Sequence, residues 1–235
     1  MKSTAIGILA ILLVSAFCVL LLLTVDYHGA RGGTDNPYLA AGASETGAVN
    51  LVSGIYLNYR LYDSLFELLI FSMAVLGVRF YLNAEKSTKP NVARVAESPV
   101  VRIAADLLFG PIMLIGVYLI VFGHLSPGGG FSGGAVGGTG LLLCAAALGA
   151  EVVARRFHEQ IIEQIEWGIL LLIILFAVAP IFFDRLPLTD LLPSGRVGKL
   201  LSGGTIPIYN GLIGIKVFIG TWVVIYSFIR HRGEI

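Results

Sequence analysis

The stretch that decides the fold is Ile206–Ile229, IPIYNGLIGIKVFIGTWVVIYSFI, in which 24 residues include one charged side chain, Lys216. A transmembrane helix needs about 20 mostly apolar residues, so this stretch is long enough to cross a bilayer. In lipid it has to be helical, because each backbone N–H and C=O must be satisfied within the segment. Lys216 is about ten residues from either end, far from both membrane surfaces.

Five other stretches have a similar length and composition. They run from about Thr4 to Val25, Leu61 to Leu82, Ile103 to Phe122, Ala135 to Ala154 and Ile165 to Phe183. The composition agrees, because 56% of the 235 residues are hydrophobic and 13% are charged, against about 25% charged in a soluble domain. The sequence therefore predicts an all-α, polytopic integral membrane protein with six transmembrane helices.

The same numbers exclude several classes of protein. The 16 Lys and Arg residues balance 15 Asp and Glu residues, so there is no basic surface for nucleic acid, and disorder needs a far more polar chain. Two cysteines are too few for a disulfide framework or a four-cysteine zinc site. No nucleophile–base pair and no haem or iron–sulfur ligand pattern is visible. An enzyme acting alone is therefore the least favoured class, and no cofactor is expected in this chain.

Lysine and arginine counts in the loops predict the orientation. With six spans, the N-terminus, the loops after the second and fourth spans and the C-terminus share one side, which holds nine Lys and Arg residues against five on the other side. Both termini are therefore expected to be cytoplasmic. We expect the first span to be a retained anchor, because its apolar run exceeds the roughly 7–15 residues of a signal peptide.

The polar stretch 83–97 is interpreted as a linker between two modules. Residues 1–82 then form a two-helix module and residues 98–235 a four-helix module. Residues 46–60 are only moderately apolar and end in Asn58-Tyr59-Arg60. We expect them to lie along the outer membrane surface and to lead into the second span.

A charged side chain at the centre of a bilayer costs about 2.5–3.5 kcal/mol on insertion scales. The presence of Lys216 in this span therefore indicates a function or a compensating interaction. One interpretation makes it a proton or ion relay. The other makes it half of a structural ion pair with a neighbouring helix or another protein chain. The residues themselves leave both open.

Asp63 and Glu67 are four residues apart, so they share one face of the second span. Glu67 lies about 9 Å into that span, and two carboxylates this close resist joint ionisation. Arg60 is three residues before Asp63 and can pair with it. Asp63 is then either an interfacial residue or, like Glu67, part of an ion path.

The remaining acidic residues near spans have a simpler interpretation. Asp106 and Glu151 lie near cytoplasmic ends, where interfacial solvation explains them. Glu159, Glu163 and Glu166 are expected to form a solvated face before the fifth span, with Glu166 nearest to the membrane.

A glycine-rich stretch, GHLSPGGGFSGG at 123–134, joins the third and fourth spans. It lacks the Gly-Lys-[Ser/Thr] of a phosphate-binding loop, and a tight re-entrant turn is expected instead. His124 is either a proton relay at the outer mouth or a residue that ties the loop down. Small residues at four-residue spacing favour close packing of another helix against the fourth span. The glycines singled out for the turn and for packing are Gly128, Gly129, Gly130, Gly133, Gly134, Gly137 and Gly138.

The glycine-rich stretch closely resembles the Gly-His-x-x-Pro-Gly-Gly-Gly-Phe-x-Gly-Gly signature of the MrpB component of the multisubunit Mrp-type Na⁺/H⁺ antiporters. Phe109, Pro111 and the ending from Pro207 to Lys216 also fit that family. The resemblance covers about residues 98–235. It implies a prokaryotic cell membrane and partnership with other Mrp-like membrane subunits in a hetero-oligomeric complex.

The first module is similar to the C-terminal end of MrpA, another component of the same antiporters, through residues 45–52, 59–67 and 76–78. Its acidic positions match Asp63 and Glu67, although Phe66 stands where a glycine is common. The resemblance implies that this region helps to line an ion pathway. A short MrpA-like end joined to an MrpB-like module resembles the Mrp-derived part of membrane-bound hydrogenase and sulfane sulfur reductase complexes of anaerobic archaea. The resemblance implies iron–sulfur clusters in partner subunits.

We therefore expect a membrane subunit of an Mrp-type module that moves Na⁺ or H⁺. Asp63, Glu67, Lys216 and His124 are the predicted pathway residues, and oxygen ligands suit a hard cation. The alternatives are the MrpB component of a stand-alone antiporter, a purely structural scaffold, and an independent small transporter. The last is disfavoured because no inverted repeat is visible.

Overall fold

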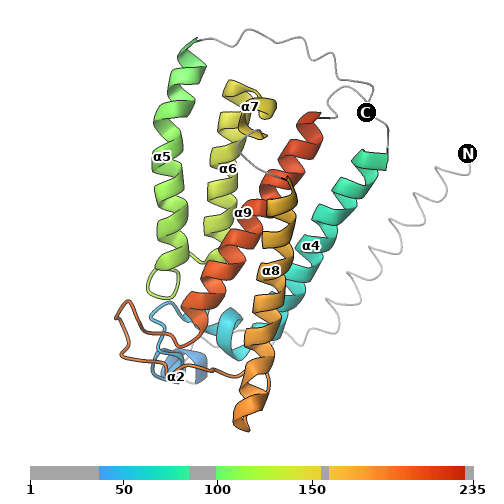
Figure 1. The fold of residues 1–235 in the computed structure, drawn as a ribbon. Coiled ribbons are helices and arrows are strands. Elements are labelled where there is room, and N and C mark those ends of the chain that lie inside the picture. The colour runs from blue at the N-terminus through green and yellow to red at the C-terminus, as the bar shows by residue number, and fades with distance from the viewer. Residues whose placement is uncertain (1–36, 85–98, 155–158, 231–235) are drawn as a thin grey trace, which may run out of the picture. The chain divides into compact units, whose positions relative to one another are not determined.

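The computed structural model describes residues 37–84, 99–154 and 159–230, and within these ranges every regular element is a helix. The described helices are α2 (Pro37–Thr46), α3 (Leu51–Gly54), the π-helix η1 (Ile55–Tyr59), α4 (Leu61–Ala84), α5 (Pro99–Val121), α6 (Gly130–Leu148), α7 (Ala150–Ala154), α8 (Glu159–Val178), the 3₁₀-helix η2 (Ala179–Phe183) and α9 (Ile206–Arg230). Figure 1 shows the long helices side by side, with the short α2 at one end.

Five of these elements are long and apolar enough to cross a membrane. The spans are Leu61–Leu82, Pro99–Val121, Gly130–Leu148, Gln164–Phe183 and Ile206–Phe228. The prediction of an all-α, polytopic membrane protein is confirmed. The first predicted span, 4–25, and most of the predicted linker, 83–97, lie outside the described residues. The orientation and the division into modules stay predictions.

The fourth span differs from its prediction at both ends. Helix α6 begins at Gly130 rather than near Ala135, and it ends at Leu148, where Gly149 has a φ of 90° and separates it from α7. Five residues of the glycine-rich stretch are thus helical, and the turn between α5 and α6 is confined to 122–129. Gly129 precedes the helix with a φ of 137°, a conformation that L side chains rarely adopt.

Helices α5, α6 and α9 make the most extensive packing in the described structure. The glycines of α6 face both neighbours. A Cβ at Gly133 would lie 2.5 Å from Ile120 on α5, and one at Gly134 would lie 2.5 Å from the carbonyl oxygen of Gly214 on α9. Gly137 and Gly138 similarly face Phe218 and Thr221 on α9. The absence of side chains lets the three backbones approach closely, which is how helices associate strongly in lipid.

Two further helices pack on the other sides of α9. Helix α4 contacts α9 and η1, and α8 contacts α9. The shared core contains apolar side chains from α4, α8 and α9, including Leu68, Ile173, Ile213 and Val217. Helix α9 therefore lies at the centre of the described bundle and borders each of the other four spans.

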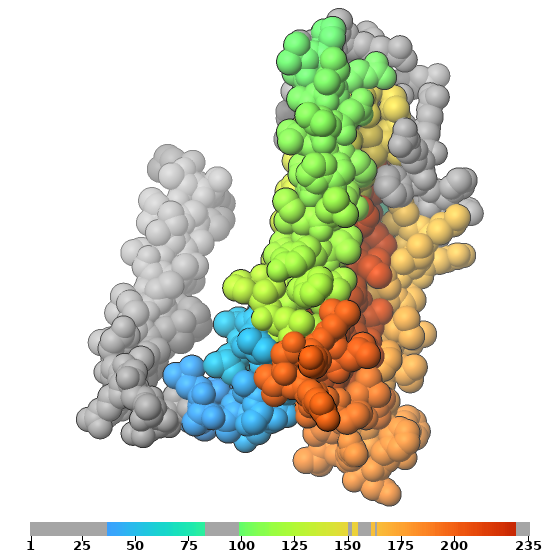
Figure 2. All heavy atoms as spheres, turned by 90° about the vertical axis from the view of Figure 1, so that its left-hand side faces the viewer, coloured from blue at the N-terminus to red at the C-terminus, as the bar shows by residue number. Residues whose placement is uncertain are grey.

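The segment 37–60 and the loop that follows η2 gather at the end of the bundle where α5 turns into α6 (Figures 1 and 2). Side-chain hydrogen bonds fix this arrangement. Asp190 in the loop accepts from the hydroxyl of Thr205 at 2.6 Å and from the amide of Asn58 in η1. The polar end of the molecule is thus built jointly from residues far apart in the sequence.

Candidate functional site

Lys216 forms a buried ion pair with Glu166. The ammonium group of Lys216 on α9 contacts Oε1 of Glu166 on α8, and the side chains are 2% and 8% exposed. Apolar residues of the same two helices, among them Ile169, Ile213 and Val217, belong to the surrounding core. The pair is therefore shielded from solvent and from lipid by the protein itself.

The burial of Glu166 corrects the expectation that it belongs to a solvated face. The acidic run 159–166 looks like the polar start of a helix, and Glu166 differs from its neighbours only by its place at the edge of the predicted fifth span. Glu166 is buried rather than exposed because the packing of α8 against α9 brings the first turns of α8 to the middle of α9. The available signal was Lys216 itself, since ionisable residues within a span commonly pair with one another or with backbone carbonyls.

The two predicted carboxylates of α4 have different surroundings. Asp63 forms a salt bridge with Arg60, with 2.5 Å between Oδ2 of Asp63 and Nη2 of Arg60. The side chain of Asp63 is 31% exposed. This is the expected pair at the start of the span. Glu67 is exposed on the outside of α4, and no residue in the described ranges forms an ion pair or a hydrogen bond with it.

Tyr56 connects the surroundings of Glu67 to the interior. Burial raises the pKa of the Tyr56 phenol, and the negative charge of Glu67 raises it further, while the hydrogen bond with Ser53 lowers it. The Tyr56 hydroxyl donates to Oδ1 of Asn210 at 3.3 Å. The same oxygen accepts the N–H of Gly130 at 2.9 Å. This polar chain joins η1, α9 and the first residue of α6.

Asn210 is fully buried and Tyr56 partly so, and sequence reasoning missed both. Their surroundings also explain Gly129, because a Cβ at that position would overlap the Tyr56 hydroxyl. A single polar residue near a helix start is common in any sequence. Only the three-dimensional arrangement identifies these two as partners.

The turn between α5 and α6 is held by Asn50. Its side-chain amide donates to the carbonyl oxygens of Gly123 at 2.7 Å and Ser126 at 3.0 Å, and its backbone N–H donates to the carbonyl of His124 at 3.0 Å. Gly128 packs against Leu119, where a Cβ would lie 2.8 Å from the carbonyl oxygen. The predicted glycine turn is therefore held in place by hydrogen bonds from Asn50, in the segment before α4.

His124 is fully buried, and its Nε2 is 3.1 Å from the carbonyl oxygen of Leu200. Burial lowers the pKa of His124 most, and nearby backbone carbonyls raise it by less, so the imidazole is held neutral. With Nε2 protonated, it donates to Leu200 and ties the turn to the loop before α9. Its Nδ1 has no hydrogen-bond partner within the described residues.

The four predicted pathway residues do not form one cluster. Asp63 pairs with Arg60, His124 bonds to Leu200, Lys216 pairs with Glu166, and Glu67 points outward. No hydrogen bond or ion pair among the described residues links any two of the four. What the structure adds is a buried acid–base pair inside the bundle and a solitary carboxylate on its surface.

Comparisons with known proteins agree with this architecture. Residues 100–223 match the family described as a domain related to the MnhB subunit of the Na⁺/H⁺ antiporter. An uncharacterised protein of Methanocaldococcus jannaschii is 25% identical over 195 residues, which are 73% of each chain. A chain of the membrane-bound sulfane sulfur reductase, an archaeal respiratory membrane complex, is 30% identical, with a TM-score of 0.74, covering 98% of this chain and 99% of that one.

A chain of the Mrp complex from Dietzia sp. DQ12-45-1b has a TM-score of 0.73 at 21% identity, so that likeness shows the fold. It covers all of this chain and 27% of that one. The glycine-rich stretch that carried the resemblance lies within the matched residues 100–223. The chain belongs to the family of proteins related to the MnhB subunit of Na⁺/H⁺ antiporters.

Proposed function

We propose that this chain is a membrane subunit of an Mrp-type Na⁺/H⁺ translocating module, where it contributes to the ion path and to subunit assembly. Family membership supports the module. The observation that carries the role in the path is the buried pair of Glu166 and Lys216. Intramembrane ionisable residues are expensive and commonly mark proton or ion pathways.

The chemistry of the pair suits a proton relay. When both groups are ionised, each compensates the other inside the bundle. When a proton moves from the ammonium group to the carboxylate, both become neutral, and neither state leaves an isolated buried charge. A cation that passes nearby attracts the Glu166 carboxylate and repels the Lys216 ammonium group. It therefore shifts the equilibrium between the ionised and the neutral pair, because electrostatic interactions are strong where water is excluded. The pair can therefore respond to the arrival of a cation without unfolding the bundle.

Glu67 and Asp63 are proposed to serve the outer half of the path. Carboxylate oxygens are the ligands that hard cations prefer, and Glu67 is unpaired within the described residues. His124 is proposed as a neutral hydrogen-bonding group near that end. Its low pKa favours a role through its ring nitrogens as donor and acceptor rather than through a fixed positive charge.

We further propose that the module works in a redox-driven respiratory complex of a prokaryotic cell membrane, with iron–sulfur clusters in partner subunits. The match along nearly the whole of both chains to a component of the sulfane sulfur reductase complex supports this choice. Membership of a stand-alone antiporter is the second candidate, supported by the shared fold with the Mrp complex. A scaffold without a pathway role is the third.

Transport by the intact complex, assayed in membrane vesicles, distinguishes these roles. We expect Glu166→Gln/Lys216→Met, which leaves no uncompensated buried charge, to reduce cation-coupled proton movement while the complex still assembles. Lys199→Ala is the matched control, because Lys199 is exposed in the loop before α9. Normal transport by this variant in an assembled complex would leave only the scaffold role. Co-purification with iron–sulfur subunits separates a redox-driven complex from a stand-alone antiporter.

A further inference from the structure

Helix α4 presents two unlike faces. One face packs on α9 and η1 through buried residues that include Leu61, Ser64, Leu68 and Val75. Glu67 lies on the other face, about 9 Å beyond the first residue of the span. A carboxylate that faces lipid at this depth is unfavourable, because nothing there solvates or neutralises it. A protein group that covers Glu67 would remove this cost.

The neighbours of Glu67 on this face suit a second helix. Spacings of three and four residues place Asp63, Glu67, Ile70, Ala74, Gly77 and Tyr81 along one line. Ala74 and Gly77 are exposed, and a Cβ at Gly77 would meet nothing within 4 Å. Small residues separated by about one turn are the surface against which transmembrane helices approach closely.

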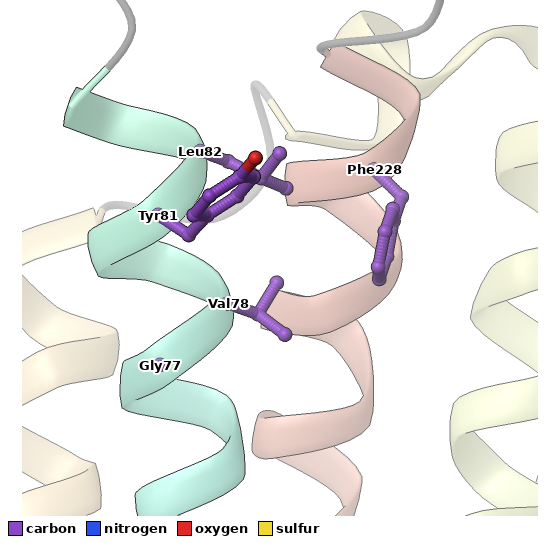
Figure 3. Close-up of a pocket in the computed structure, with 5 residues that line it drawn as sticks. All are labelled: Gly77, Val78, Tyr81, Leu82 and Phe228. Carbon is purple, nitrogen blue, oxygen red and sulfur yellow. The ribbon is translucent and has the colours of Figure 1, made fainter. Parts of the chain in front are cut away.

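The line runs into an apolar groove at the far end of α4. Figure 3 shows Gly77, Val78, Tyr81 and Leu82 on α4 opposite Phe228 on α9, and these five residues line an open groove of about 320 Å³. Gly77 and Tyr81 belong both to the line and to the groove. A helix lying along the line can therefore place an apolar side chain in the groove while a charged residue meets Glu67.

From this arrangement we propose that the Glu67 face of α4 is an intersubunit interface, occupied by a transmembrane helix of another protein that carries a lysine or arginine opposite Glu67. The inference rests on the proposed function only in that the chain works in a hetero-oligomeric complex. It concerns the assembly of that complex, and it is compatible with a place for Glu67 in the ion path because a carboxylate offers about four acceptor sites.

Charge argues against two other occupants. The apolar stretch 4–25 of this chain has no charged residue, so its sequence offers no cation to Glu67. A second copy of this chain, related by the usual twofold axis, brings the same patch against itself. Glu67 then faces another Glu67, and two like charges repel. A partner helix with a cation is the occupant that satisfies both the charge and the small-residue line.

Site-directed crosslinking in native membranes tests the contact. A photoreactive side chain at Ala74 in the assembled complex is expected to capture a transmembrane helix of another protein of the complex, identified by mass spectrometry. Leu76 is the control position, because it is also exposed but lies about 180° around the helix from Glu67. A crosslink from Ala74 only to lipid, to a second copy or to residues 1–36 of the same chain contradicts the proposal.

Charge reversal then tests the pairing. Glu67→Lys is expected to lower recovery of the captured protein with this chain at least about tenfold. Reversing the opposing lysine or arginine to glutamate in that partner is expected to restore recovery. Unchanged recovery with Glu67→Lys, or restoration by Arg31→Glu in this chain, overturns the proposal. These readouts report assembly alone, so failure of the proposed ion path appears separately, as lost or normal transport in an assembled complex.

Discussion

Lys216 in the middle of α9 donates a hydrogen bond to Oε1 of Glu166 on α8, and both side chains are almost completely buried. The two residues are 50 positions apart in the chain, so their contact is a product of the fold alone. It places one acid and one base side by side in an apolar core, where neither charge is tolerated without the other.

Removing one member of the pair leaves the other as an uncompensated buried charge. Glu166→Gln or Lys216→Met alone is expected to lower the free energy of unfolding by about 3–5 kcal/mol. The double variant Glu166→Gln/Lys216→Met is expected to lose much less, because it leaves no charge behind. Detergent-induced unfolding in mixed micelles measures all three. Additive losses in the double variant would show that the two side chains do not interact.

The packing of α6 predicts a sharp contrast between glycines. Gly133→Ala and Gly134→Ala place a methyl group about where Ile120 and the Gly214 carbonyl already are, and overpacking of this kind costs about 1–3 kcal/mol. Gly110→Ala on α5 is the control, since a Cβ there meets nothing within 4 Å. The midpoint of thermal unfolding should fall for the first two variants only. An equal fall for Gly110→Ala would mean that helix packing is not the cause.

Asn210 should be the most sensitive uncharged residue of the polar network. Asn210→Ala leaves the Gly130 N–H and the Tyr56 hydroxyl without their shared acceptor. An unsatisfied buried polar group costs about 1–3 kcal/mol. Tyr56→Phe removes a donor but leaves Asn210 bonded to Gly130, so it should cost less. Unfolding experiments on both variants test this order, and a larger loss for Tyr56→Phe would contradict it.

His124 predicts a pH dependence of stability. Its pKa in the folded protein lies below the ordinary 6.5, so the unfolded chain binds more protons between those two values. Stability is then fully present above about pH 6.5 and declines as the pH falls from there toward the lowered pKa. Thermal unfolding at about pH 7.5 and about pH 5.5 should show a larger loss for the wild-type chain than for His124→Gln. An equal loss in both would assign the pH dependence to other groups.

Long apolar runs made the five described spans predictable, because length and hydropathy suffice to identify a helix in lipid. The start of α6 was not predictable in this way. Glycine disfavours a helix by about 1 kcal/mol per residue, so Gly130–Gly134 looked like a turn. Close contact with α5 and α9 outweighs that preference.

The candidate site was only half visible in the sequence. Lys216 stood out because it interrupts an apolar run, whereas Glu166 was hidden among the acidic residues that precede α8's apolar stretch. Tyr56 and Asn210 carry no local signal, since their importance comes from a contact across 154 residues. Partners of this kind depend on helix packing, which a single sequence does not specify.

The central claim is that Glu166 and Lys216 form part of the ion path and are more than a structural pair. The most direct test is the rate of cation-coupled proton transport by the assembled complex that contains Glu166→Gln/Lys216→Met. A neutral, similarly sized pair is tolerated in many protein interiors, so assembly should be retained. We predict that transport falls at least about tenfold, a conservative bound beside the roughly 10²–10⁴-fold that a positioned proton-transfer group typically contributes. Transport within about twofold of wild type in a fully assembled complex would contradict the claim.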